Sequence, residues 1–336
     1  MFRIAGIEVN LTSDEDAIRN TLTTWIDLLA TDAAEAPTPD APTFTIHFTT
    51  VPDASIAPPS PTDLPYATYL YVSGFRSEQN RVVFRGTDNS VMTVDIAAGR
   101  AECRVPRSAL DGPPWPLRDL TNAALTTLLR SRGHYPLHAA ALTRGDDALL
   151  IVGPPMAGKT TLGLNFLRRG WSWVADDKVL LSRSPDGSVS ASGLFRHSNV
   201  DPALAGWFPE LAGVASRDPL YPHSRKRGIH LEEFYGDRPR TACRPNRILF
   251  PQVVDLGPTT VEPLDGTAAF VELLRQTPVE NDVPAVRGNL DLLASLSRDA
   301  RAFRVLMGRD LLEDACRLPE LGSDLGLAVG PPLHGG

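Results

Sequence analysis

Apolar positions in the first third of the chain predict one helix among several short strands. Between Ile18 and Leu29 they recur every three or four residues, which predicts a helix over Glu15–Leu29. Runs of β-branched and aromatic residues, bounded by turn residues, predict short strands. These strands are expected at Phe2–Leu11, Thr43–Thr49, Tyr69–Ser73, Arg81–Arg85 and Ser90–Asp95. The proline-rich stretch from Pro52 to Pro65 is typical of a surface loop.

The pattern changes near His134, where short apolar strands begin to alternate with helices. A helix at Pro116–Arg130 leads into this region. Further strands are expected at Leu137–Thr143, Ala148–Val152, Trp171–Ala175 and Ala302–Leu306, and further helices at Thr160–Arg169, Thr267–Arg275, Asn289–Arg298 and Asp310–Arg317. This alternation predicts an α/β sheet. We therefore expect an α+β N-terminal domain over residues 1–110 and an α/β domain over residues 111–330.

Composition narrows the class of protein. The chain has 336 residues, of which 42% are hydrophobic and 22% charged, as is ordinary for a globular protein with a sizeable core. Its net charge of −7 argues against a nucleic-acid or anionic-membrane partner. Cys103, Cys243 and Cys316 lie far apart in the sequence and predict reduced thiols. Neither a signal peptide nor a membrane-length apolar run is recognisable, so we expect a cytoplasmic protein.

A glycine-rich loop follows the strand expected at Ala148–Val152. Its sequence, Gly153-Pro154-Pro155-Met156-Ala157-Gly158-Lys159-Thr160, matches the Walker A pattern in full. The glycines let successive backbone N–H groups point at phosphate oxygens, and the following helix adds its positive N-terminal end. We expect Lys159 to reach the β- and γ-phosphates, Thr160 to bind Mg²⁺, and Thr161 to complete the nucleotide site. The expected ligands are Mg²⁺ and ATP, or another nucleoside triphosphate.

Two adjacent aspartates, Asp176 and Asp177, follow this loop after one helix and one strand. They come at the carboxyl end of the strand expected at Trp171–Ala175, the edge where ligands of open α/β sheets gather. Consecutive strand residues point to opposite faces, so one carboxylate can face Mg²⁺ while the other faces an incoming hydroxyl. Because a phosphotransferase requires both functions, the pair favours a kinase.

The segment LHAAAL…ALLIVGPPMAGKTTLGLNFLRRGWSWVADDKVLL, within Leu137–Leu181, resembles the catalytic core of HPr serine kinases and related proteins. That family shares its core with phosphoenolpyruvate carboxykinases. The resemblance implies a P-loop core with a mixed sheet, preceded here by the smaller α+β domain. It also implies that Asp176 is the catalytic base, that Asp177 is associated with the metal, and that His138 lies close to the transferred phosphate.

The phosphoryl acceptor is expected to be a serine or threonine hydroxyl of a peptide or small protein. The signature that follows the Asp-Asp strand in HPr kinases is not recognisable here, so we expect an acceptor other than HPr. Related proteins in peptide natural-product pathways resemble kinases of lasso-peptide precursors. A peptide needs a groove or an exposed sheet edge, which the strand at Arg81–Arg85 could offer. The N-terminal domain is therefore a candidate for acceptor recruitment, and a homo-oligomer is compatible with these expectations.

Three cations between His223 and His230 form a second candidate element. Arg225, Lys226 and Arg227 could close over the γ-phosphate and offset its charge, and a solvated surface loop is the alternative. Two other functions stay open beside the peptide kinase. One is a small-molecule kinase, because shikimate-kinase-like proteins also place acidic residues one helix and strand after the P-loop. The other is a regulatory protein that senses the nucleotide without transferring phosphate.

Overall fold

The computed structural model describes residues 1–29, 42–56, 64–69, 72–76, 81–219, 224–236, 240–255, 257–277, 283–313 and 317–327. The chain forms two compact units, which consist of Met1–Tyr135 with Val279–Asn289 and of Pro136–Pro278 with Leu290–Gly336. The helix at Trp115–Arg130 packs within the first unit, on its strands. The compact units thus divide after Tyr135, while a functional division at residue 110 stays a prediction.

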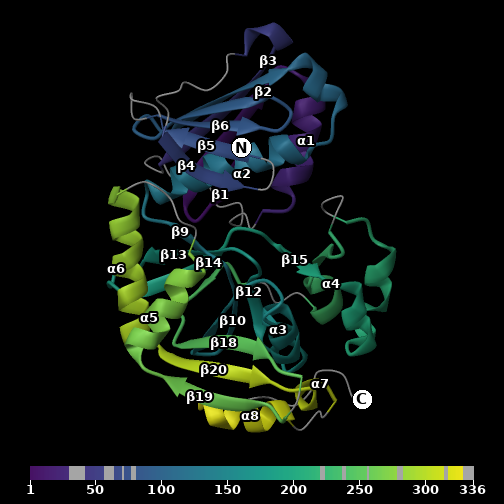
Figure 1. Ribbon diagram of the computed structural model, residues 1–336, viewed down its shortest axis with the longest axis vertical. Helices are drawn as coiled ribbons and strands as arrows, with labels where there is room; N and C mark the ends of the chain where they lie inside the picture. Colours follow the sequence, from purple (N-terminus) through teal and green to yellow (C-terminus); the bar gives the residue numbers. More distant parts are fainter. Residues whose placement is uncertain are drawn as a thin grey trace. The chain divides into compact units, whose positions relative to one another are not determined.

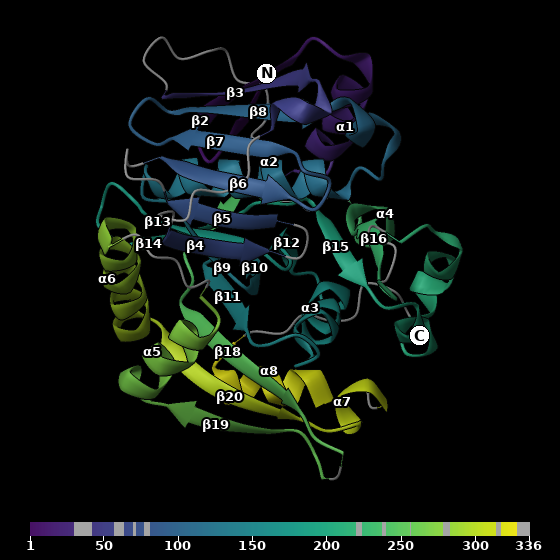
Figure 2. The ribbon, with the colours of Figure 1, turned by 45° about the horizontal axis from the view of Figure 1, so that its top comes forward.

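The first unit contains an eight-stranded sheet with the order β1-β2-β3-β8-β7-β6-β5-β4. Its elements are β1 (Phe2–Ile4), β2 (Ile7–Ser13), α1 (Asp16–Ile26), β3 (Thr43–Val51), β4 (Leu64–Tyr69), β5 (Val72–Arg76), β6 (Val82–Gly86), β7 (Val91–Asp95), β8 (Arg100–Pro106) and α2 (Trp115–Arg130), with 3₁₀ turns at Asp53–Ser55 and Arg107–Asp111. Figure 2 shows β8, β7, β6, β5 and β4 following one another across this sheet. Helix α1 packs on β2, and α2 packs on β5, β6 and β7. The two helices are joined where the indole N–H of Trp25 donates to the Asn122 side chain over 3.0 Å.

Three expectations for this unit are corrected. The apolar run Phe2–Leu11 is a hairpin rather than one strand, because Ala5 and Gly6 both have positive φ and turn the chain between β1 and β2. The strand expected at Tyr69–Ser73 is two strands, β4 and β5, and residues 70–71 lie outside the described part of the chain. The segment Arg81–Arg85 offers no free edge, because β6 pairs with β5 on one side and with β7 on the other.

The second unit contains the phosphate loop and three sheets. Its strands are β9 (Tyr135–Leu137, which begins at the last residue of the first unit), β10 (Ala139–Arg144), β11 (Asp147–Val152), β12 (Ser172–Ala175), β13 (Val179–Arg183), β14 (Val189–Gly193), β15 (His197–Val200), β16 (Arg227–His230), β17 (Ala242–Cys243), β18 (Arg247–Val253), β19 (Thr260–Leu264) and β20 (Arg301–Met307). Its helices are α3 (Lys159–Arg168), α4 (Glu232–Tyr235), α5 (Gly266–Arg275), α6 (Val283–Asp299, which begins in the first unit), α7 (Asp310–Glu313) and α8 (Arg317–Leu325), with 3₁₀ turns at Pro202–Gly206 and Pro209–Ser216. The helix expected at Asp310–Arg317 is described at Asp310–Glu313 as α7, residues 314–316 lie outside the described part of the chain, and α8 was not expected.

The main sheet of this unit has the order β12-β10-β11-β18-β20-β19 and is mixed. Strands β10 and β11 form an antiparallel hairpin, whereas β11 pairs with β18, and β18 with β20, in parallel. Smaller sheets have the orders β17-β14-β13-β9 and β15-β16. The predicted α/β class with a mixed P-loop sheet is therefore confirmed.

The two faces of the main sheet carry different helices (Figure 1). Phe303, Val305 and Met307 of β20 share one buried cluster with residues of α3 and α8. Arg304 points the other way by strand alternation, and it reaches Glu272 of α5. Helices α3 and α8 therefore cover one face, and α5 lies on the other. Within the described residues, no helix is both long and apolar enough to cross a membrane.

Candidate active site

The phosphate loop connects β11 to α3, at the carboxyl end of the parallel strands. Gly158, immediately before α3, has φ +99°, and a Cβ there would lie 3.1 Å from Met307 Sδ and 3.2 Å from Val253 Cγ2. Glycine is therefore required at this position both by conformation and by space. Met156 also has positive φ, 68°, although it carries a side chain. The loop thus curls at two points, as a phosphate-binding loop must.

Lys159 is almost fully buried, and its side chain binds the backbone of the phosphate loop from inside. Its Nζ donates to the backbone oxygens of Gly153 and Pro154 over 2.7 and 3.0 Å, and to His138 Nε2 over 2.8 Å. Burial lowers the pKa of Lys159 to about 8, assisted by the positive charge of Lys226 and opposed by the two aspartates. Its ammonium group therefore lies where it could donate hydrogen bonds to a phosphate oxygen.

His138 precedes β10 and lies between Lys159 and Asp177. Its Nε2 accepts from the lysine, so the ring proton is on Nδ1, which donates to the backbone oxygen of Asp177 over 2.9 Å. Burial lowers the pKa of His138, which agrees with a neutral ring. Its backbone N–H donates to the oxygen of Gln276 over 3.2 Å, a partner that the sequence did not indicate. The histidine therefore fixes the position of Lys159.

Asp176 is the buried carboxylate of the site, with 2% of its surface exposed. Burial, followed by the negative charge of Asp177, raises the pKa of Asp176 to about 6, while Lys159, Lys226 and the backbone N–H of Asn199 oppose the rise. The Thr160 hydroxyl donates to its Oδ2 over 3.5 Å. A carboxyl of this kind is ionised at neutral pH and still basic enough to accept a proton.

Asp177 lies next to Asp176 but in a different environment. Strand β12 ends at Ala175, and the N–H of Lys178 donates to the Asp176 oxygen over 2.7 Å, so both aspartates lie in a tight turn. Asp177 has φ 67°, a left-handed conformation that aspartate tolerates better than most residues. Its side chain is 42% exposed, and its Oδ1 lies 3.3 Å from His138 Nδ1. The turn thus gives the pair one buried and one accessible carboxylate.

The hairpin of β15 and β16 brings a cation to these carboxylates. It pairs Asn199, whose N–H reaches Asp176, with Gly228, close to Lys226. The positive charge of Lys226 acts on His138, Lys159 and Asp176. Lys226 is therefore the cation of the basic segment that faces the site.

The other two cations of this segment are placed differently. The Arg227 guanidinium donates to backbone oxygens of its own loop, including that of Arg225 over 2.8 Å, so it stabilises the turn. The Arg225 side chain makes no hydrogen bond or ion pair within the described residues. His223, at the start of the segment, lies outside them.

The oxygen ligands at the loop fit Mg²⁺. This ion binds through one or two carboxylates together with substrate phosphates and water, so it needs no dense cluster of protein ligands. None of the described residues forms a group of three or more His, Cys, Asp or Glu that could hold a metal by itself. The Thr160 hydroxyl and the aspartate pair supply hard oxygen atoms beside the P-loop.

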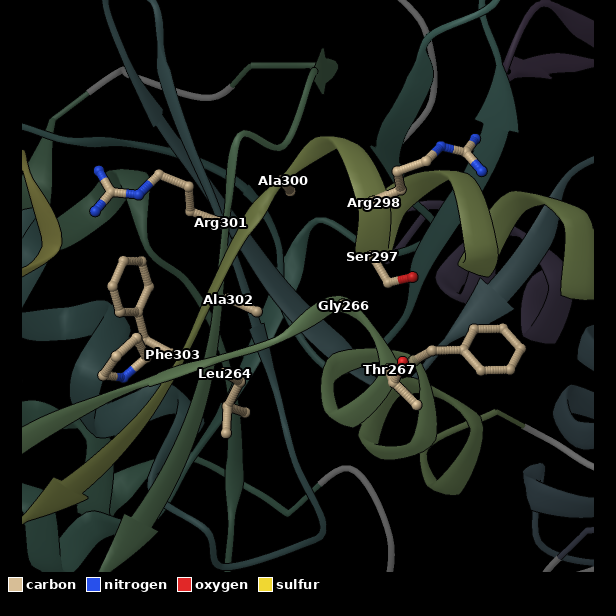
Figure 3. Close-up of a pocket in the computed structure, with 11 residues that line it drawn as sticks. Leu264, Gly266, Thr267, Ser297, Arg298, Ala300, Arg301, Ala302 and Phe303 are labelled. Carbon is tan, nitrogen blue, oxygen red and sulfur yellow. The ribbon is translucent and has the colours of Figure 1, made fainter.

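Two cavities of similar size lie on the α5 side of the main sheet. One, of about 640 Å³, is formed by the start of α5, the end of α6 and the start of β20, and contains none of the expected site residues. Figure 3 shows Arg298 and Arg301 at opposite sides of it. The other, of about 720 Å³, includes Gly153–Ala157 of the phosphate loop in its wall. Only the second cavity is therefore continuous with the candidate site.

Comparisons with known proteins identify no family for this chain. No protein-family model and no curated protein matches the chain. Among solved structures, the Hpr(Ser) kinase/phosphatase from Coxiella burnetii aligns with 14% identity over 57% of this chain and 98% of its own, with a TM-score of 0.29. A likeness at this TM-score carries no functional argument, so function is inferred from the site.

Proposed function

We propose that this protein is a kinase that transfers the γ-phosphoryl group of a nucleoside triphosphate to a hydroxyl group. The observation that carries the proposal is the buried carboxylate of Asp176 beside the phosphate loop, with Lys159 and Lys226 close enough to act on its charge. A loop that only senses a nucleotide needs no group able to accept a proton. A base with a pKa of about 6 is suited to deprotonating an alcohol as it attacks.

The roles follow from the contacts. The acceptor oxygen attacks the γ-phosphorus in line as the bond to the leaving diphosphate breaks, and its proton passes to Asp176. Lys159 and Lys226 offset the negative charge on the transferred group. His138, neutral and bonded to Asp177, keeps Lys159 pointed into the loop. Thr160 and Asp177 would hold Mg²⁺, which supplies charge neutralisation between the phosphates when it is bound.

The reverse assignment of the aspartates is the competing one. The 3.5 Å contact between Thr160 Oγ1 and Asp176 Oδ2 brings Asp176 close to the hydroxyl that would bind the metal. The more exposed Asp177 would then face the acceptor. The raised pKa and burial of Asp176 favour our assignment, because Asp177 is the carboxylate that can accommodate a hydrated ion.

Asparagine substitutions separate the two assignments. Asp177→Asn should weaken Mg²⁺-dependent ATP binding, and asparagine tolerates the left-handed backbone there. Asp176→Asn should leave binding within a few-fold and slow transfer by roughly two to four orders of magnitude, the range for a lost general base. Binding is measured by calorimetry with ATP at several Mg²⁺ concentrations, and transfer by single-turnover consumption of ATP. The opposite pattern would make Asp177 the base and Asp176 the metal ligand. Normal transfer in both variants would refute the proposed kinase activity.

The acceptor class is also a proposal. We infer a serine or threonine of a peptide or small protein, on the basis of the sequence resemblance to protein-serine kinases over Leu137–Leu181. The test incubates the protein with Mg²⁺, ATP and either serine- and threonine-containing peptides or free amino acids and sugars, and detects the gain of one phosphate by mass spectrometry. Phosphorylation of a free metabolite with none on any peptide would assign the protein to the small-molecule kinases.

A further inference from the structure

Arg168, the last residue of α3, is the side chain on which two separate elements converge. Its Nε and Nη2 donate to the two carboxylate oxygens of Glu210, each over 2.9 Å. Its Nη2 also donates to the backbone oxygen of Trp207 over 2.9 Å. The Tyr235 hydroxyl donates to Glu210 Oε1 over 2.7 Å. Glu210 precedes Lys226 in the chain and Tyr235 follows it, so these bonds join α3 to the chain on both sides of the lysine.

This network is better shielded from water than an ordinary surface ion pair. The side chains of Arg168 and Glu210 are 30% and 21% exposed, and Tyr235 is 5% exposed. The guanidinium carbon of Arg168 lies 4.2 Å from the centre of the Phe208 ring. An arginine that binds a carboxylate through two parallel bonds and also stacks on a ring is held in one orientation. The contact therefore fixes a geometry as well as joining two segments.

Lys226 immediately precedes β16, and β15 and β16 form a sheet of two strands with four residues each. A two-stranded hairpin is at best marginally stable in water, so its position depends on what it packs against. Strand β15 contacts α3 (Figure 2), and Ile229 of β16 shares a buried cluster with Leu164 of α3. Apolar contact is non-directional, so the directional bonds of Arg168 are what can fix the hairpin along the helix.

Helix α3 connects this network to the phosphate loop. Lys159 is the first of its ten residues and Arg168 is the last, which makes the helix about 15 Å long. The helix therefore carries the phosphate-binding lysine at one end and the anchor of the hairpin at the other. A shift of about 1 Å in a group that acts on the reacting atoms can slow a reaction about a hundredfold, so the position of Lys226 relative to this helix matters.

We propose that Arg168, Glu210 and Tyr235 are positioning residues that hold Lys226 against the transferred phosphate. The inference rests on the proposed function, in which Lys226 offsets the charge of that phosphate, and it gives a role to side chains at the far end of α3 from the phosphate loop. Glu210 is the centre of the network, because it accepts from both Arg168 and Tyr235. Its loss lets the hairpin shift on α3, while the bonds of Lys159 to the phosphate loop are kept.

Substitutions of Glu210 test the inference in the full chain. Glu210→Ala removes both bonds, whereas Glu210→Gln keeps the shape of the side chain and one oxygen that can accept from Arg168. Glu233→Ala is the matched control, because Glu233 is a 43% exposed glutamate of α4 that pairs with Arg217 over 2.5 Å. Single-turnover consumption of ATP with Mg²⁺ is measured for each variant, alone and combined with Lys226→Ala. Calorimetry measures ATP binding, and urea unfolding checks that each variant is folded.

We expect Glu210→Ala to slow transfer about three- to tenfold, because a misplaced Lys226 stabilises the transition state less. Its affinity for ATP should change less than about threefold, as for an interaction that acts mainly in the transition state. Glu210→Gln should lie between Glu210→Ala and wild type, and Glu233→Ala should stay within about twofold of wild type. In the Lys226→Ala background, Glu210→Ala should slow transfer by less than about twofold more, because the lysine that it positions is gone.

A wild-type rate for Glu210→Ala, or a loss of the same size with and without Lys226, would overturn the positioning role alone. A merely structural role predicts the second outcome, because partial unfolding lowers the rate equally in both backgrounds. If Glu210→Ala does not fold, Tyr235→Phe replaces it in the same comparison, with a loss of about two- to threefold that disappears in the Lys226→Ala background. Failure of the wild-type protein to consume ATP would overturn the proposed function as well.

Discussion

Replacing Asp176 with asparagine should make the protein more stable while it removes the proposed base. The pKa of this carboxyl rises from an ordinary 3.8 to about 6, first because of burial and then because of Asp177. The unfolded chain therefore releases this proton at lower pH than the folded chain does. Stability falls as pH rises from about 4 to about 6 and then levels off. With about 1.4 kcal/mol for each pKa unit, the ionised group destabilises the fold by about 3 kcal/mol at neutral pH.

The assay is urea unfolding of the wild-type protein and Asp176→Asn between pH 4 and pH 8, without nucleotide or metal. The variant should exceed the wild type by less than about 1 kcal/mol at pH 4 and by about 3 kcal/mol at pH 7. Asp177→Asn removes only the second of the two causes that raise the pKa of Asp176, so its gain over wild type at pH 7 should be the smaller of the two. A difference for Asp176→Asn that stays constant with pH, or a wild type that is the more stable at pH 8, would refute the reasoning.

Three further substitutions test the loop, the cation and the packing of α3. Lys159→Ala should abolish calorimetric binding of ATP with Mg²⁺, because it removes the ammonium inside the loop; wild-type affinity would contradict the P-loop assignment. Lys226→Ala should slow transfer by about tenfold or more in single-turnover assays, whereas Arg225→Ala, its neighbour and control, should not. Gly163→Ala places a Cβ 2.9 Å from Trp173 Cζ3, so urea unfolding should show a loss of about 1–3 kcal/mol. An increase in the free energy of unfolding, the usual effect of replacing glycine with alanine in a helix, would mean that the Trp173 ring can shift at little cost.

The parts of the site that the sequence predicted are those fixed by local rules. The phosphate loop, helix α3 and the aspartate turn lie within one continuous segment, where glycine conformation and strand alternation act over a few residues. The two strands that form the hairpin of β10 and β11 were predicted for the same reason, and His138, just before β10, lies beside Lys159. Short-range signals therefore identified the groups, and the structure adds their distances.

The parts that the sequence did not predict depend on pairing between distant segments. Strand β8 was not expected, and it pairs in parallel with β3, about fifty residues earlier. The basic segment offered three similar cations, and the pairing of β15 with β16 selects Lys226. The expectation of a free edge at Arg81–Arg85 was wrong because β6 pairs with β5 on one side and with β7 on the other, which its own sequence does not indicate. Such choices are made by tertiary pairing, which a single segment does not encode.

The burial that destabilises ionised Asp176 is also what suits it to catalysis. An aspartate in water, with a pKa near 4, is a weak base. A pKa of about 6 makes Asp176 a stronger base that is still ionised at neutral pH, as a general base requires. The same burial lowers the pKa of Lys159 to about 8, and the attraction between the ammonium and the carboxylate limits both shifts. Lys159 Nζ donates its three hydrogen bonds to the backbone oxygens of Gly153 and Pro154 and to His138 Nε2, so an incoming phosphate has to displace one of these acceptors. A phosphate oxygen carries more negative charge than a backbone oxygen, so we expect it to replace one of these acceptors when a nucleotide binds.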